Sequence, residues 1–100
     1  MNQVPIPTEI EQVASELRLP VDGLMQRSVR AFLLQEQRAV QMDIADFRDR
    51  YNVADVAELR RQIEQGETYS HPAWEDSIEW EQLETYRNQL EQLLGMVSNV

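Results

Sequence analysis

One uninterrupted helical pattern constrains the fold of this chain more than any other feature. Residues 23–52 contain no proline, and apolar side chains recur along one side of the segment at the spacing of an α-helix. About thirty helical residues would extend roughly 45 Å at 1.5 Å per residue. A compact domain of about 100 residues has a radius of gyration of only about 13 Å. The sequence therefore predicts that the helix bends, or that the molecule is elongated and buries this stripe against another chain.

A short arm and a short helix are predicted ahead of the long helix. Two prolines within residues 1–7 exclude a helix there and favour extended backbone. Thr8 and Glu11 have the spacing of a capping box, in which each side chain binds a free amide at the helix start. Pro20 and Asp22 suit the first turn and the cap of the long helix. We therefore expect a turn near Pro20 between the two helices.

Two more helices are predicted after the long one. Asn52 is typical of a left-handed helix end, and Asp55 and Glu58 repeat the capping-box spacing. Gly66 ends this third helix. A polar linker then leads to a fourth helix over about residues 73–96, whose apolar residues are spaced three and four apart. The predicted fold class is mainly α, with a short arm or strand followed by about four helices.

The charge of the chain limits its partners. Eighteen acidic residues against nine basic residues, all arginine, produce a formal net charge of −9. This charge repels phosphate backbones and anionic membrane surfaces, which disfavours nonspecific nucleic-acid binding. No apolar run approaches the ~20 residues of a membrane span, and the amino terminus lacks the pattern of a secretory signal. Because the chain also lacks cysteine, we expect a cytoplasmic protein without disulfides and without membrane association.

The residue types that carry catalysis are scarce. His71 is the single histidine, and the adjacent Ser70 is better explained as a helix cap than as a nucleophile. His71, Glu75 and Glu79 would share one helical face, but a metal site needs further convergent ligands, and acids are favoured in a first turn by the helix dipole. The chain has no lysine and no glycine-rich phosphate loop. We therefore expect no enzymatic activity, no metal and no cofactor.

The fourth helix is predicted to bind a partner protein. Its aromatic side chains offer more area than a lone helix can hide, and Trp and Tyr are favoured interface anchors. Packing within the chain itself is the alternative. Acidic residues on its other faces would steer a basic partner toward it. The predicted partner-binding residues are Trp74, Glu75, Ile78, Glu79, Trp80, Leu83, Glu84 and Tyr86.

Two stretches of the chain resemble known prokaryotic proteins. The segment VPIPTEIEQVASELRLPVDGLMQRSVRAFLLQEQ resembles a ribbon-helix-helix unit, in which two chains pair their arms as a ribbon above four helices. The segment FRDRYNVADVAELRRQIEQGETYSHPAWEDSIEWEQLE is similar to the tail of CopG-like or VapB-like antitoxins of type II toxin-antitoxin systems. The first resemblance implies a homodimer. Its predicted dimerisation residues are Val4, Ile6, Leu24, Val29, Phe32 and Leu33.

The resemblance also implies DNA contacts, with two departures from the pattern. Asn2 and Gln3 occupy ribbon positions and can read adenine edges, and Arg27 and Arg30 could contact phosphates. The ribbon has no cation to anchor such contacts, and Asp22 lies in the turn that would face phosphate. We therefore expect nucleic-acid binding to be weak or dependent on a partner.

These patterns combine into one functional hypothesis. Residues 1–51 would form a ribbon-helix-helix-like dimerisation module, residues 52–66 a helical extension, and residues 67–100 an acidic amphipathic helix that binds a partner independently of the front. The chain would act as an antitoxin-like protein that neutralises a small basic toxin by covering its basic surface. The alternative is a non-enzymatic helical homodimeric adaptor or assembly protein. A DNA-binding autorepressor is the third possibility.

Overall fold

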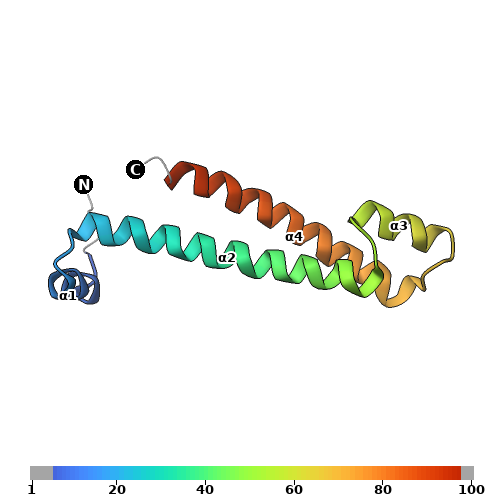
Figure 1. Ribbon diagram of the computed structural model, residues 1–100, viewed down its shortest axis with the longest axis horizontal. Helices are drawn as coiled ribbons and strands as arrows, with labels where there is room; N and C mark the ends of the chain where they lie inside the picture. The colour runs from blue at the N-terminus through green and yellow to red at the C-terminus, as the bar shows by residue number, and fades with distance from the viewer. Residues whose placement is uncertain (1–5, 98–100) are drawn as a thin grey trace.

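The computed structural model describes residues 6–97 and contains four helices: α1 (Thr8–Leu17), α2 (Val21–Tyr51), α3 (Val56–Glu64) and α4 (Ser70–Val97). α4 runs back along α2, while α1 and α3 lie at opposite ends of this pair (Figure 1). The molecule measures 60 × 30 × 24 Å, with a Cα radius of gyration of 19.9 Å. This radius is well above the ~13 Å of a compact domain of this length. The mainly helical class and the elongated shape are therefore confirmed, while burial of the α2 stripe against another chain stays a prediction.

The long helix has the predicted end but a different start. Asn52 takes the left-handed conformation, with φ 52° and ψ 48°, and closes α2. At the other end the cap residue is Pro20, and no side chain caps the helix. Asp22 lies inside the first turn, so its prediction as a cap is wrong. An acidic side chain is still favoured there because the first turn carries the positive end of the helix dipole.

α1 also begins differently from the prediction. Its cap residue is Pro7, which makes no side-chain cap bond, so the capping box of Thr8 and Glu11 is wrong. Because Thr8 is already the first helical residue, Glu11 stands one position too far along to complete the box. The helix ends at Arg18, whose φ of 55° is left-handed, and the amide of Leu19 donates to the carbonyl of Ala14 at 2.9 Å. This bond is typical of a Schellman end.

The start of α3 confirms Asp55 as the cap, while Glu58 reaches back one residue further than the Asp55 amide that a capping box uses. The amide of Glu58 donates to Asp55 Oδ1 at 2.8 Å, and Glu58 Oε2 accepts a bond of 3.0 Å from the amide of Ala54. Gly66 follows the cap residue Gln65 with a φ of 74°, a conformation that favours glycine. The local sequence therefore sets both ends of this short helix.

One hydrophobic core joins α2, α3 and α4. The indole of Trp80 stacks on the ring of Phe47, with 5.9 Å between ring centroids. The predicted segments 1–51, 52–66 and 67–100 all contribute to this core, so the polar linker does not set α4 apart as a separately packed unit. The buried core residues are Leu33, Val40, Ile44, Phe47, Val53, Leu59, Ala73, Trp80 and Leu90.

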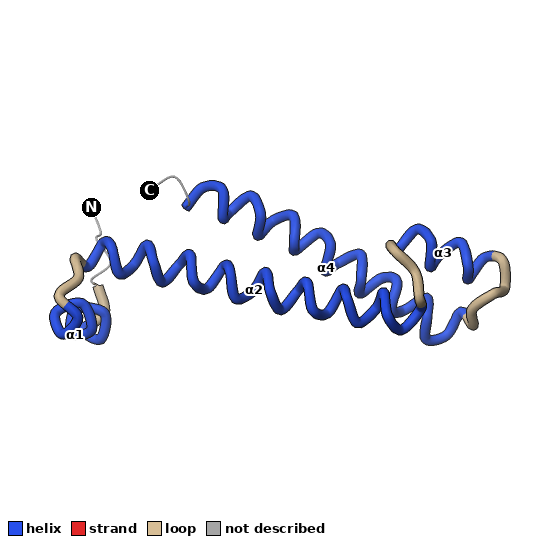
Figure 2. The backbone as a smooth tube through the Cα atoms, in the orientation of Figure 1, coloured by secondary structure: helices blue, strands red, loops and turns tan. Residues whose placement is uncertain are grey.

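The predicted ribbon can be compared with the structure only in part. Residues 6–97 contain no strand, and their helices are joined by short loops (Figure 2). The ribbon positions Asn2, Gln3 and Val4 lie outside the described residues. Within the described part of the chain, no helix is both long enough and apolar enough to cross a membrane. The ribbon-helix-helix arrangement therefore stays a prediction, whereas the helices α1 and α2 are confirmed.

Candidate interaction surfaces

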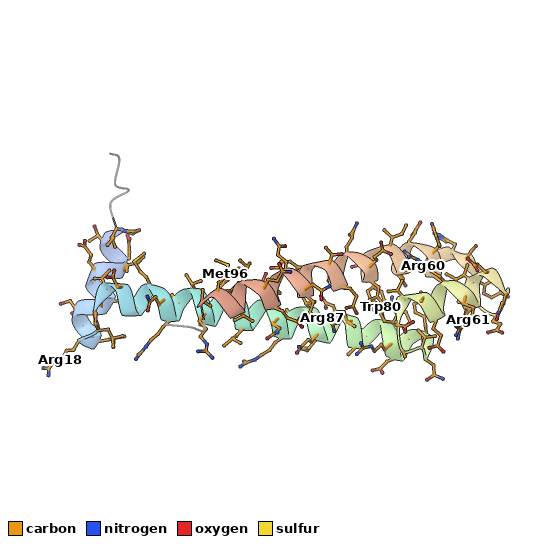
Figure 3. The ribbon with its side chains drawn as sticks, turned by 90° about the horizontal axis from the view of Figure 1, so that it is seen from above. Arg18, Arg60, Arg61, Trp80, Arg87 and Met96 are labelled. Atoms are coloured by element: carbon orange, nitrogen blue, oxygen red, sulfur yellow. The ribbon has the colours of Figure 1, made fainter. Side chains whose placement is uncertain are left out.

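The predicted partner-binding residues of α4 divide between two faces of the helix. Trp80 is fully buried, and Leu83 and Tyr86 are half-buried against the core. Trp80 lies on the side of α4 that faces α2 (Figure 3), and its indole N–H donates to Glu84 Oε1 at 3.3 Å. A buried indole whose N–H is satisfied is a core residue. The prediction that Trp80 anchors a partner is therefore corrected in favour of packing within the chain.

Four of the other predicted residues remain exposed on α4, whereas Glu84 is half-buried and forms a salt bridge of 2.6 Å with Arg87. Trp74 is 50% exposed and Ile78 is 41% exposed, and both acidic neighbours are exposed as well. Residues four apart on a helix lie one above the other, so the two apolar side chains are adjacent and the two carboxylates form a second row beside them. We call this set the Trp74 surface; it consists of Trp74, Glu75, Ile78 and Glu79.

An arginine of α3 holds the Trp74 surface in place. The Arg60 guanidinium lies over the indole of Trp74, 5.5 Å from the ring centroid. Arg60 also binds Glu81 through a salt bridge of 2.5 Å and donates to the hydroxyl of Ser77 at 3.4 Å. These contacts fix Arg60 between α3 and α4. The stacked guanidinium thereby restricts the indole of Trp74 while leaving half of it exposed.

A second polar cluster joins the end of α2 to the start of α4. The hydroxyl of Tyr51 donates a short hydrogen bond to Asp76, and the same carboxylate accepts a bond of 2.9 Å from Arg50. The guanidinium of Arg50 lies 5.2 Å from the ring centroid of Phe47. Burial raises the pKa of Tyr51, and the hydrogen bond to Asp76 raises it further. The neutral phenol is therefore the form that this cluster stabilises.

Tyr86 takes part in the α2–α4 contact as well. Its hydroxyl donates to Glu36 Oε1 on α2 at 2.7 Å. This hydrogen bond, followed by burial and by the charge of Glu36, raises the pKa of Tyr86. Tyr86 was predicted to contact a partner, but its polar end is satisfied inside the chain. The bond also shows which side of α4 faces which side of α2.

The two tyrosines lead to an expected loss of stability at alkaline pH. Their pKa values are raised above the ordinary value of about 10. Their contribution is therefore complete below about pH 10 and is lost as the pH rises through the raised values. We expect the free energy of unfolding, measured in urea at about pH 9 and about pH 11, to fall less in the double variant Tyr51→Phe, Tyr86→Phe than in the wild type. An equal fall in both proteins would contradict this assignment.

The structure also places His71 and its acidic neighbours, for which no metal was predicted, and two of the predicted DNA-contacting residues, Arg27 and Arg30. His71 Nδ1 lies 3.4 Å from Glu75 Oε1, and both side chains are exposed. Within residues 6–97, no group of three or more potential ligands is arranged to hold a metal ion. Arg27 and Arg30 are exposed on α2, where they line an open hollow of about 360 Å³ together with Val97. The structure thus brings these two arginines near the carboxyl end of α4.

The predicted dimerisation residues also differ in how exposed they are. Leu33 is buried in the core and Leu24 is half-buried, so neither is free to dimerise through its whole side chain. Val4 lies outside the described residues, and Ile6 is 38% exposed. Val29 and Phe32 are 48% and 57% exposed. Of the predicted dimerisation residues on α2, Val29 and Phe32 are therefore the ones that are accessible to a second chain, and they share one helix face.

Further exposed apolar side chains extend this face. Met25 precedes Val29 by one turn of α2, and near the end of α4 two large apolar residues are exposed. None of these three residues is among the predicted dimerisation or partner-binding residues. α4 reaches this part of α2, because Val97 lies beside Gly23 and Arg27, so these side chains are exposed by their position around each helix and not by the length of α2. We call this set the front apolar surface; it consists of Met25, Val29, Phe32, Leu93 and Met96.

Comparison with known proteins found one related family. A family model described as "Uncharacterized protein MJ0235 family" matches residues 1–99. A search of the curated proteins and a search of the solved structures found no match. The family match covers nearly the whole chain.

Proposed function

We propose that this chain, which belongs to the MJ0235 family, is a non-enzymatic antitoxin-like protein that binds and neutralises a small basic protein in the cytoplasm. One observation carries the proposal. The exposed Trp74 and Ile78 form an apolar pair beside two exposed carboxylates, on a helix whose opposite face is held in the core. A half-exposed tryptophan with flanking charge has the composition of an interface anchor and its polar rim.

The rigidity of the Trp74 surface supports this function. α4 is fastened to α2 by Trp80 and Leu90 and to α3 by Arg60. The surface is therefore ordered before a partner arrives, and association loses less side-chain entropy than with a free helix. This differs from the mechanism predicted from the sequence, in which an independent tail would carry the anchors.

The charge of the chain supports a basic partner. Glu75 and Glu79 lie beside the apolar pair, and the whole chain has a net charge of −9. This field accelerates the approach of a cationic surface, while the indole enters an apolar recess of the partner. Acidic side chains would then cover arginines and lysines that the toxin needs for its own RNA or substrate. Inhibition would be steric and electrostatic, without any chemical step.

The test uses the protein encoded by the gene adjacent to that of this chain. We expect it to be small and basic, to stop growth when expressed alone, and to be neutralised by coexpression of this chain. Truncating an interface tryptophan costs on the order of 2 kcal/mol, so Trp74→Ala is expected to raise the Kd about 30-fold, mainly through faster dissociation. Glu75→Gln with Glu79→Gln is expected to slow association and to flatten its salt dependence.

Matched control variants distinguish the effect of the Trp74 surface from the effect of losing any exposed apolar or acidic side chain. Met42 is an exposed apolar residue of α2, and Met42→Ala is expected to bind as the wild type does. Glu9→Gln with Glu11→Gln removes the same charge from α1 and is expected to change association less than the α4 pair. A neighbour that is not basic or does not bind, or a Trp74→Ala variant with unchanged Kd, would contradict the proposal.

A helical homodimeric adaptor or assembly protein is the second candidate function. The observation in its favour is the front apolar surface, which lies at a distance from the Trp74 surface along α4. An antitoxin-like protein can also be a dimer, so the two candidates differ in whether a basic partner is neutralised. Weak or partner-dependent nucleic-acid binding through the exposed Arg27 and Arg30 stays part of the proposal. Any such binding would weaken steeply with salt.

A further inference from the structure

The Tyr86 contact determines which exposed residues of α2 and α4 lie on the same side of the molecule. Tyr86 donates to Glu36 across the antiparallel pair. Leu93 follows Tyr86 by two turns of α4, and Val29 precedes Glu36 by two turns of α2. Because α4 runs back along α2 (Figure 1), Leu93 and Val29 lie at about the same height and on the same side. The exposed side chains therefore form one continuous surface across both helices.

The front apolar surface extends from Val29 and Leu93 along both helices. On α2, Phe32 and Met25 lie on the same face as Val29, at spacings of three and four residues. On α4, Met96 follows Leu93 by three residues, and it is 71% exposed near the carboxyl end (Figure 3). A contiguous apolar face on a soluble protein marks an interaction site.

We propose that a second copy of this chain covers the front apolar surface, in a two-fold symmetric dimer. The distribution of charge along the chain favours a second copy over a basic protein at this surface. Residues 6–33 contain four acidic residues and three arginines, so this end of the molecule is almost neutral. The remaining acidic excess lies further along the chain. When two copies contact each other through their front ends, their acidic ends lie far apart. The electrostatic repulsion between the two chains is smallest in that arrangement.

A basic protein would bind a different part of the molecule. Its attraction would be strongest at the acidic outer face of α4 and weakest at the nearly neutral front. Mixed charges around an apolar centre are also self-complementary, because an arginine of one copy can meet a carboxylate of the other in a symmetric contact. The front apolar surface and the Trp74 surface would therefore have different occupants.

The front apolar surface provides the apolar centre of a dimer interface. A standard interface buries about 800 Å² on each partner. The accessible surface of the chain is 7817 Å², so such an interface would cover about a tenth of it. Five large apolar side chains on two neighbouring helices form the apolar centre that an interface of this size requires. A symmetric contact there would bring together the first turns of α2 and the last turns of α4 from both copies, as four packed helix ends.

Sedimentation velocity of the full chain tests the dimer without any partner protein. We expect the wild type, 11.7 kDa per chain, to sediment as a dimer at micromolar concentration. Phe32→Glu places a charge at the centre of the surface and is expected to raise the dimer Kd at least 100-fold while the helical circular dichroism is kept. Met42→Glu places the same charge on an exposed apolar site of α2 outside the surface and is expected to leave the Kd unchanged.

A cross-linking experiment locates the contact. The chain has no cysteine, so Val29→Cys introduces a unique thiol. We expect oxidation to link Val29→Cys into a covalent dimer and to leave Met42→Cys largely unlinked. Three results would each overturn the inference. They are a folded wild-type monomer at about 100 µM, equal effects of the two charged variants on the dimer Kd, and equal linking of the two thiols. Neither experiment involves a basic partner, so failure here is distinct from failure of the Trp74 proposal.

Discussion

Trp80→Ala is expected to lower the free energy of unfolding by about 3–5 kcal/mol, as is usual when a buried aromatic side chain is removed from a core. The indole is fully buried and stacks on Phe47 between α2 and α4. Its removal leaves a cavity and also leaves Glu84 without the indole N–H donor. A small domain has only about 5–15 kcal/mol of stability, so this loss is a large share of the total. Urea or thermal unfolding at fixed protein concentration measures it.

Trp74→Ala is the matched control for Trp80→Ala. The same residue type is removed from the same helix, but the Trp74 ring is half exposed and contacts the Arg60 guanidinium. We expect a loss of about 1 kcal/mol or less, from the cation–π contact and the covered half of the ring. Each kcal/mol corresponds to a fall in Tm of roughly 4–8 °C for a domain of this size. Similar losses in both variants would place the two tryptophans in equivalent surroundings and contradict the structure.

Removal of residues 67–100 is expected to unfold the remaining chain. Ala73, Trp80 and Leu90 supply three of the nine buried core residues, and all three lie on α4. Without them the apolar face of α2, which includes Ile44 and Phe47, would be open to water. Helices in proteins derive most of their stability from such tertiary packing. Circular dichroism of residues 1–66 should show a reduced helical signal and no cooperative thermal transition.

A complementation experiment provides the control for this truncation. Mixing residues 1–66 with a peptide of residues 67–100 is expected to restore helical signal and cooperativity, because the two pieces together contain the full core. If residues 67–100 were independent of the front, as the sequence pattern suggests, the front would instead remain folded when the last helix is removed. A cooperative transition in residues 1–66 alone would support that earlier expectation and show that the α2–α4 contact is dispensable.

The amino-acid sequence by itself determined the helices of this protein and most of their ends. Asn52 ends α2 and the pair Asp55 and Glu58 starts α3, because left-handed ends and side-chain caps depend on a few neighbouring residues. The length of the α2 pattern also predicted an elongated molecule. The start of α1 was missed because Pro7 and Thr8 both suit a helix start, and the choice between them shifts Glu11 by one position.

Only the tertiary structure decided which side of each helix is buried. Trp74 and Trp80 look alike in the sequence, because α4 has apolar side chains around much of its circumference. The packing of α2 selects Trp80 for the core and leaves Trp74 outside. The contact of Arg60 with Trp74 likewise joins two helices whose residues are distant in the chain. Such contacts depend on how the helices cross in space, and no local pattern of residues encodes that arrangement.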